Sequence, residues 1–209
     1  MDPIADVVAA LRRGGLIVFP TDTVYGVGAA PNDPAATAGL FEAKRRPPGL
    51  TLPVLTASTE EAAGLARFDE RAERLATAFW PGPLTLVLRR SDLSAPWDLG
   101  GTDADTIGLR VPSHRLALRV LSAAGPVATT SANPSGAPPI VTCDELHAVF
   151  GDLVAVYLCE EEPLMGTAST VLDLSHGEPK VLRAGAVTAD DIAKILGGRV
   201  PLLDSPPPG

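Results

Sequence analysis

The sequence has few cysteines and no long apolar run. Only Cys143 and Cys159 occur in 209 residues, with no C-x-x-C pair and no cluster of cysteine and histidine. We therefore expect neither a disulfide framework nor a zinc site, and this usage is typical of a reducing cytosol. No apolar run approaches the roughly 20 residues of a membrane span, and the N-terminus does not have the pattern of a signal peptide. The sequence predicts a soluble, cytoplasmic protein that does not enter a membrane.

The sequence also has fewer basic than acidic residues. Lysine and arginine number 17 against 25 acidic residues, which gives a net charge of −8. This balance argues against broad, sequence-independent binding of nucleic acid, which needs a surplus of positive charge. It is compatible with a local basic cleft. The chain is 45% hydrophobic, enough to bury a substantial core in one large or two small domains.

Helix and strand signals alternate along the chain. Asp-Pro pairs and capping-box spacings mark helix starts, and short apolar runs mark strands. This pattern favours an α/β fold, a twisted sheet of mixed parallel and antiparallel strands with flanking helices. We expect one domain over residues 1–196 and a disordered tail over 197–209. The expected helices span 2–14, 33–44, 58–61 and beyond, 70–79, 113–124, 142–149 and 188–196, and the expected strands 16–19, 51–56, 84–88, 107–111, 127–130, 153–158, 169–174 and 180–183.

Four polar segments adjoin predicted strands or helix ends. In α/β sheets, ligands bind beyond strand ends, where loops present side-chain and backbone donors. These segments are therefore the candidate site. They read PTDTVYGVG from Pro20, EAKRRPP from Glu42, ATTSANPSG from Ala128 and GTASTV from Gly166.

Two of these segments have both a structural and a functional interpretation. Lys44, Arg45 and Arg46 place positive charge at a helix C-terminus, where it complements the helix dipole; the same charges could clamp phosphate. Ser131 and Asn133 lie in a loop whose Asn-Pro and Ser-Gly pairs are common in turns. The same loop could hold a hydroxyl and an amide against a ligand. The residues alone leave both pairs of alternatives open.

Several familiar sites are absent from the sequence. Pro31 falls where the third glycine of a dinucleotide fingerprint belongs, and no Walker A or G-x-S-x-G pattern occurs. Asp103 and Asp105 form a D-x-D pair, which is common in solvated loops, so we predict no metal site there. The three histidines are isolated, and we expect capping or surface roles for His114, His147 and His176.

The motifs together resemble those of the YrdC/TsaC family, the threonylcarbamoyl-AMP synthases of tRNA modification. The resemblance covers about Ile4 to Leu196 in one consistent order. It includes a PT(D/E)TVYGLG-like opening, K-x-R-P, W-P-G-P-L-T, T-x-x-x-R-x-P, S-A-N-x-S-G, S-T-V-x-D and L-R-x-G, at Pro20–Gly28, Lys44–Pro47, Trp80–Thr85, Thr106–Pro112, Ser131–Gly136, Ser169–Asp173 and Leu182–Gly185.

The resemblance implies a YrdC-like domain with a concave basic cleft. Its activity would join L-threonine, bicarbonate or CO2, and ATP into threonylcarbamoyl-AMP and pyrophosphate, with Mg2+ accompanying ATP. A threonylcarbamoyl transferase acting on tRNA would use the product downstream. The implied catalytic residues are Lys44 and Arg46; the implied threonine-binding residues are Thr23, Arg110 and Ser169; and the implied nucleotide-binding residues are Lys44, Arg46, Thr106, Ser131, Asn133 and Arg183.

The sequence departs from the family pattern after K-x-R-P. Leu50 stands where many relatives have a polar residue, and Leu55 where some have histidine. These departures keep two alternatives in view. One is a paralogue of the YciO type with an uncertain activity on nucleotide or RNA, and the other is a module that binds double-stranded RNA or tRNA.

Overall fold

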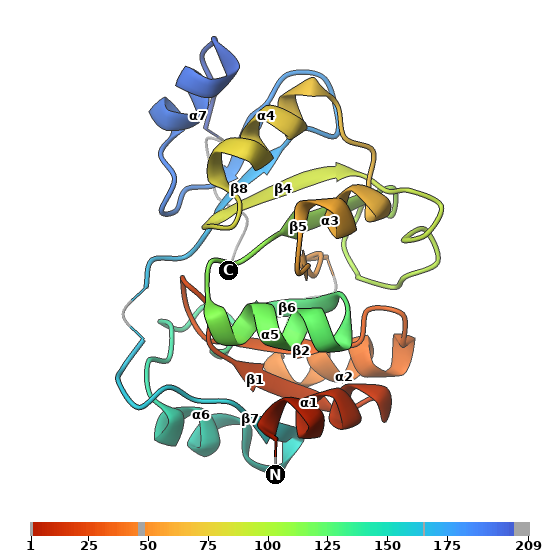
Figure 1. Cartoon of the computed structure of the whole chain (residues 1–209), viewed down its shortest axis with the longest axis vertical. Coiled ribbons are helices and arrows are strands. Elements are labelled where there is room, and N and C mark those ends of the chain that lie inside the picture. Colours follow the sequence, from red (N-terminus) through yellow and green to blue (C-terminus); the bar gives the residue numbers. More distant parts are fainter. Residues whose placement is uncertain (1, 46–48, 165, 203–209) are drawn as a thin grey trace.

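The computed structural model describes residues 2–45, 49–164 and 166–202. Within these ranges the strands form one nine-stranded sheet in the order β7-β1-β2-β6-β3-β5-β4-β8-β9 (Figure 1). The strands are β1 (Leu16–Phe19), β2 (Gly26–Ala29), β3 (Val54–Leu55), β4 (Leu84–Arg89), β5 (Thr106–Arg110), β6 (Val127–Ser131), β7 (Val154–Tyr157), β8 (Thr170–Asp173) and β9 (Lys180–Arg183). Pairs β1–β7, β3–β5 and β4–β8 are parallel and the others antiparallel, which confirms the predicted mixed α/β sheet.

The helices begin where the sequence supplies capping side chains. They are α1 (Pro3–Arg12), α2 (Pro34–Lys44), α3 (Thr59–Leu65), α4 (Glu70–Phe79), α5 (Arg115–Ala124), α6 (Cys143–Phe150) and α7 (Ala189–Leu196), with a 3-10 turn η1 (Gly151–Leu153). Six of them have an N-cap side chain that accepts a backbone N–H bond of the first turn: Asp2, Asp33, Ser58, Asp69, Thr142 and Thr188. Such caps satisfy donors that have no partner within the helix.

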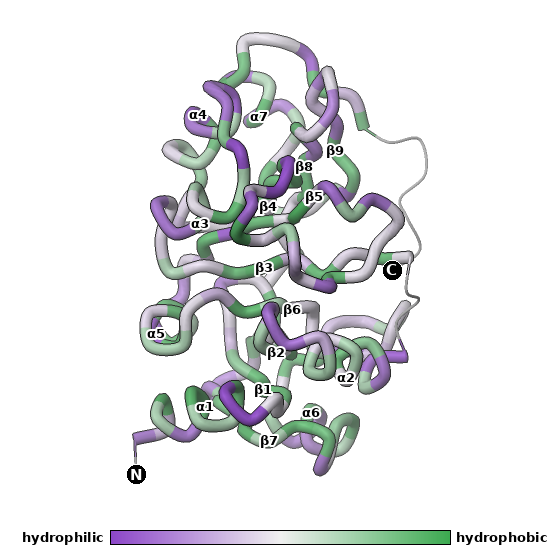
Figure 2. Tube along the Cα trace, turned by 90° about the vertical axis from the view of Figure 1, so that its right-hand side faces the viewer, coloured by the Kyte–Doolittle hydropathy of each residue, from purple (hydrophilic) through white to green (hydrophobic). Residues whose placement is uncertain are grey.

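Helices cover both faces of the sheet at its β7-β1-β2-β6 end. Ile17 and Phe19 of β1 pack with α1 and α5 on one face, whereas Leu16 and Val18 belong to the larger core cluster on the other. This division follows from the alternation of side chains along a strand. Figure 2 shows hydrophobic residues along β1 and β3, between the flanking helices.

Strand β2 was not predicted, because its sequence GVGA follows a polar segment and contains two glycines. The structure explains the glycines. A Cβ added to Gly28 would lie 2.6 Å from Cγ1 of Val127, and one added to Gly26 would lie 2.7 Å from Cγ2 of Thr129. β2 is therefore an interior strand that can pair with β1 and β6 because it carries no side chain at these two positions.

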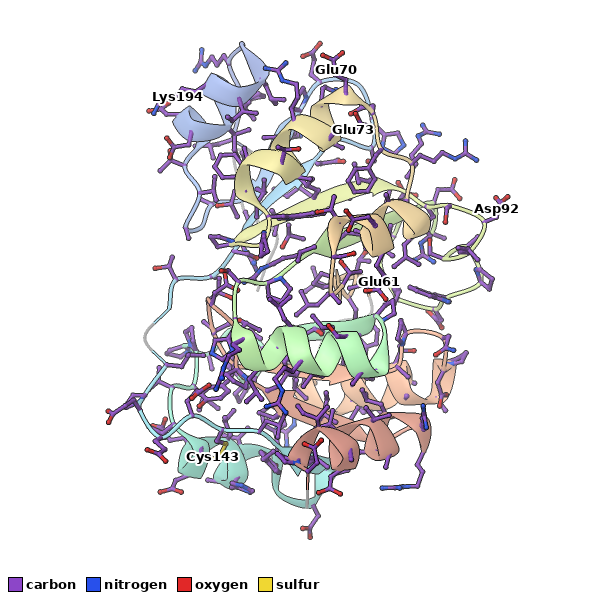
Figure 3. The ribbon with its side chains drawn as sticks, viewed as in Figure 1. Glu61, Glu70, Glu73, Asp92, Cys143 and Lys194 are labelled. Atoms are coloured by element: carbon purple, nitrogen blue, oxygen red, sulfur yellow. A yellow bond between two sulfur atoms is a disulfide. The ribbon has the colours of Figure 1, made fainter. Side chains whose placement is uncertain are left out.

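The cysteines correct an expectation from the sequence. Cys143 and Cys159 form a disulfide, so the expectation of none was wrong. The bond joins the first residue of α6 to the segment that follows β7; Figure 3 labels Cys143 on α6. Cysteine count and spacing could not reveal that the two thiols meet across an intervening helix and strand.

The domain continues past α7. Val200 is buried, and the Val181 backbone N–H of β9 donates to the Pro201 carbonyl at 3.0 Å. Residues 200–202, which the sequence predicts as part of the tail, thus pack on the sheet edge, while 203–209 lie outside the described residues. In the described part of the chain, no helix is long and apolar enough to cross a membrane.

Candidate functional site

A cavity of about 450 Å³ is lined by residues from both halves of the sheet. It lies next to the segment between β1 and β2, and residues of the strands β4, β5 and β6 contribute to its lining. The cavity gathers most of the predicted site residues, although they come from distant parts of the sequence. These are Thr23, Lys44, Arg110, Ser131, Asn133, Ser169 and Arg183.

One side of the cavity is built around Arg110 at the end of β5. Its Nε donates to the Gly82 carbonyl at 2.9 Å, one terminal nitrogen donates to Thr23 Oγ1 at 2.9 Å, and the other pairs with Asp22 at 2.5 Å. A guanidinium has five N–H bonds, so these contacts leave one on each terminal nitrogen. Two N–H bonds in this fork match a carboxylate.

The threonine-rich segment beside Arg110 is held rigidly. Thr21 Oγ1 donates to the Val24 carbonyl at 2.6 Å and lies 2.9 Å from Thr23 Oγ1. Gly166 packs directly on this segment, because a Cβ on Gly166 would lie only 1.5 Å from the Thr23 carbonyl oxygen. The hydroxyls of Thr21 and Thr23 therefore have fixed positions at the cavity wall.

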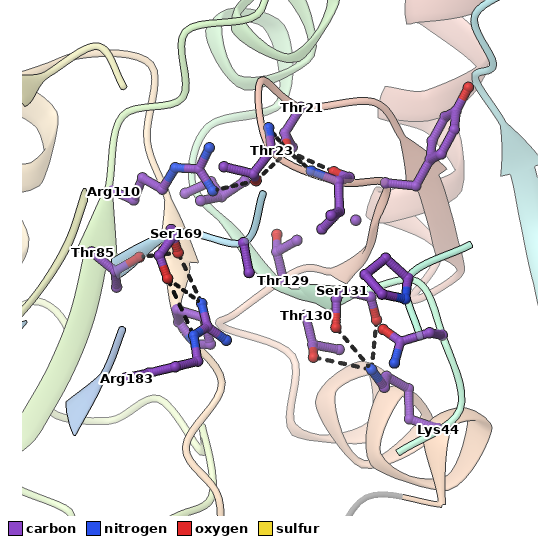
Figure 4. A pocket seen from close by; sticks show the side chains of 18 of the residues that line it. Thr21, Thr23, Lys44, Thr85, Arg110, Thr129, Thr130, Ser131, Ser169 and Arg183 are labelled. Carbon is purple, nitrogen blue, oxygen red and sulfur yellow. Dashed lines mark hydrogen bonds between the residues drawn. The ribbon is translucent and has the colours of Figure 1, made fainter. Parts of the chain in front are cut away.

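A second arginine lies on the same side of the cavity as Arg110 (Figure 4). Arg183 of β9 donates to the Ser169 carbonyl at 2.8 Å and to Ser169 Oγ at 3.0 Å. Ser169 Oγ in turn lies 3.0 Å from Thr85 Oγ1 of β4. Thr85 and Ser169 are buried, so the three side chains form a fixed polar network.

The opposite side of the cavity is formed by Lys44 and the end of β6. Lys44 is buried, and its Nζ donates to the Ser131 carbonyl at 2.5 Å and lies 3.4 Å from Thr130 Oγ1. Asn133 Nδ2 donates to the Pro134 and Ala137 carbonyls, which holds the loop in place. Its Oδ1 is a buried acceptor with no partner among the described residues.

The cavity is electropositive although the protein is acidic overall. Its described lining holds Lys44, Arg110 and Arg183 and no carboxylate. Burial lowers the pKa of Arg110, opposed by Asp22, and burial together with the nearby Arg110 charge lowers the pKa of Arg183. The buried guanidinium of Arg110 and the more exposed one of Arg183 repel each other, and together they form a site for an anion. Acidic side chains such as Glu70, Glu73 and Asp92 lie on the outside instead (Figure 3).

A second cavity of about 500 Å³ adjoins the first. The predicted nucleotide residue Thr106 lines it, as does Leu50, one of the two departures from the family pattern. Pro53, Thr85 and Arg183 line both cavities, so these residues mark their junction. The other departure, Leu55, is buried and lines the first cavity.

The structure gives roles to residues whose role the sequence did not decide. Asp22 holds Arg110 and accepts the Ser113 backbone N–H at 2.9 Å. Thr85 is the last residue of the W-P-G-P-L-T motif. This motif could have indicated a role for Thr85 in the site, but the sequence alone did not assign it one. Arg46 lies outside the described residues, and Arg45 is exposed.

The described residues contain no group of three or more histidine, cysteine or carboxylate side chains that could hold a metal ion. The carboxylate-free lining of the first cavity does not fit a resident divalent cation either. A Mg2+ ion in this site would therefore be held by oxygens of its own ligand.

Fold and site together define an α/β protein with two joined cavities, one of them rich in cations and hydroxyls. Residues 9–185 match the family model for Sua5, YciO and YrdC, whose description reads telomere recombination. The chain belongs to this family.

Two similar proteins carry the same name, threonylcarbamoyl-AMP synthase. The chain is 44% identical over 195 residues to a putative threonylcarbamoyl-AMP synthase of Mycobacterium leprae, covering 93% of this chain and 88% of the relative. It is 36% identical over 191 residues to the threonylcarbamoyl-AMP synthase of Vibrio parahaemolyticus, covering 88% of this chain and all of the relative.

Solved structures show the same fold. Sua5 of Pyrococcus abyssi, in complex with L-threonine, matches with a TM-score of 0.87 and 38% identity over 95% of this chain. This chain spans 58% of that protein's length. Escherichia coli YciO matches with a TM-score of 0.80 and 27% identity, covering 90% of this chain and 92% of YciO.

Proposed function

We propose that this protein is a threonylcarbamoyl-AMP synthase, which forms threonylcarbamoyl-AMP and pyrophosphate from L-threonine, bicarbonate or CO2, and ATP. One observation carries the proposal. A single cavity places a carboxylate-matching arginine and fixed hydroxyls opposite a buried lysine, and it adjoins a second cavity large enough for a nucleoside. The relatives bearing this name cover nearly the whole chain at 36–44% identity.

Threonine fits the side of the cavity around Arg110. Its carboxylate takes the two remaining N–H bonds of the Arg110 guanidinium, and Asp22 keeps that group oriented. The hydroxyls of Thr23 and Ser169 lie close enough to the arginines to reach the amino-acid backbone or side chain. A site that bonds the threonine hydroxyl discriminates strongly against valine, because the analogue leaves buried polar groups unpaired.

ATP occupies the rest of the site. Lys44, Ser131 and Asn133 bind the phosphates together with Arg46, whose place in K-x-R-P supports this role. Thr106 and Arg183 belong to the nucleoside side, since both line the second cavity. Mg2+ enters as part of the ATP substrate, coordinated by phosphate oxygens and water.

The reaction needs no covalent enzyme intermediate. The neutral threonine amine attacks CO2, a C–N bond forms, and the nitrogen proton passes to solvent, leaving a carbamate. A carbamate oxygen then attacks the α-phosphorus, and the bond to the pyrophosphate oxygen breaks. The chain contributes orientation of both ligands and cations for the charge at phosphorus. The product is an activated acyl group that a transferase would pass to tRNA.

The proposal is tested by mass spectrometry of the products formed with ATP, Mg2+, bicarbonate and L-threonine. We expect a threonylcarbamoyl-adenylate that disappears when threonine, bicarbonate or ATP is omitted. Its absence from folded protein that binds ATP would contradict the proposal and favour an activity of the YciO type. Salt-sensitive binding of tRNA without any nucleotide turnover would favour the RNA-binding alternative.

A further inference from the structure

Thr85 occupies a special place in the site. It extends from the interior strand β4, is 3% exposed, and lines both the amino-acid cavity and the adjoining one. Its hydroxyl lies 3.0 Å from Ser169 Oγ. The parallel neighbour β8 begins at Thr170, so Ser169 is fixed immediately before a strand that pairs with β4.

The hydrogen-bond directions around this pair are constrained. Arg183 can only donate, so Ser169 Oγ accepts from it. The two hydroxyls carry two protons and share one bond. If Ser169 donates to Thr85, the Thr85 proton is left over, and if Thr85 donates, the Ser169 proton is left over. In both cases one O–H of the pair remains for a ligand at the junction of the cavities.

The α-phosphate belongs at this junction. With the nucleoside in the second cavity and the outer phosphates near Lys44, the chain of phosphates must pass Pro53, Thr85 and Arg183, which line both spaces. The α-phosphate is the group closest to the nucleoside. Arg110, which binds the threonine carboxylate in the proposed function, is close enough to Arg183 to lower its pKa. Both reactants therefore meet beside the Thr85–Ser169 pair.

We propose that Thr85 is a positioning residue of the reaction, which sets the Ser169–Arg183 pair so that one hydroxyl proton and one guanidinium face the α-phosphate as it is attacked. The role rests on the proposed function and adds a residue to it. Removing the Thr85 hydroxyl frees Ser169 to rotate and to donate to other acceptors. The loss of stabilising hydrogen bonds is greatest in the transition state, when charge develops at phosphorus, because hydrogen bonds to charged oxygens are stronger than neutral ones.

The test compares Thr85→Val with Thr85→Ser. Valine keeps the shape of threonine and removes the hydroxyl, whereas serine keeps the hydroxyl. We expect Thr85→Val to lower kcat by roughly 10–100-fold with KM for threonine and ATP within about 3-fold, and Thr85→Ser to recover most of the rate. Thr37→Val is the matched control, since it removes a buried hydroxyl that bonds only within α2 and its cap; it should keep the kcat of the original protein.

The outcomes separate the two proposals. Product formation by the original protein with an equal kcat in Thr85→Val would overturn the role of Thr85 alone. An effect on KM without an effect on kcat would overturn it as well, because it would mean equal binding in the ground and transition states. No threonylcarbamoyl-adenylate from the original protein would overturn the proposed function, and the role of Thr85 with it. Should Thr85→Val fail to fold, Thr85→Ala provides the same comparison.

Discussion

Reduction of the Cys143–Cys159 disulfide should lower the stability of this protein measurably. The bond joins residues separated by 16 positions. In the chain-entropy treatment, a cross-link closing a loop of this size removes enough freedom from the unfolded chain to contribute about 3 kcal/mol. For a domain of about 200 residues, a change of 1 kcal/mol shifts Tm by about 2–4 °C. The reduced protein should therefore melt about 6–12 °C below the oxidised one.

The assay is thermal unfolding followed by circular dichroism, with and without a phosphine reductant. The double variant Cys143→Ser/Cys159→Ser is the control, and it should match the reduced protein and show no further response to reductant. Mass spectrometry of alkylated native protein counts the free thiols in each sample. Equal Tm values for oxidised and reduced protein would refute the stabilisation by loop closure, and two free thiols in the oxidised sample would refute the bond itself.

Three further predictions concern individual side chains. Lys44→Met keeps the apolar stem and removes the charge, so turnover should fall by roughly 100-fold in the product assay, while the far-ultraviolet spectrum stays unchanged. Arg110→Lys replaces a fork by a point charge, so calorimetry should find the threonine Kd raised by roughly 10–100-fold and the ATP Kd nearly unchanged; an equal loss for both ligands would contradict the assignment. Gly28→Ala places a Cβ 2.6 Å from Val127, and urea unfolding should show about 1–3 kcal/mol lower stability.

Much of the fold could be predicted because its signals are local. The run Leu16–Phe19 forms a strand with the predicted bounds. The Asp33 side chain caps α2 by accepting hydrogen bonds from the backbone N–H groups of Ala35 and Ala36. Strand β2 could not be predicted in this way. Glycine has low strand propensity, and the need for Gly28 arises only from Val127, which lies about a hundred residues further along the chain.

The candidate site, like the fold, could be predicted only in part. The resemblance pointed to Arg110 and Ser169, and the structure places both at one cavity. The resemblance could not indicate that Asp22 holds Arg110 or that Ser169 forms a hydrogen bond with Thr85, because these contacts depend on the pairing of strands. The separation into two adjoining cavities, with Thr106 in the second, likewise depends on three-dimensional packing.

The wide spread of the cavity residues has a consequence for biosynthesis. The lining runs from Thr21, beside β1, to Arg183, the last residue of β9, and β1 itself pairs with the much later strand β7. A chain emerging from the ribosome would hold Lys44 and Arg110 long before it holds Arg183. The cavity therefore has its full lining only once β9 has been made.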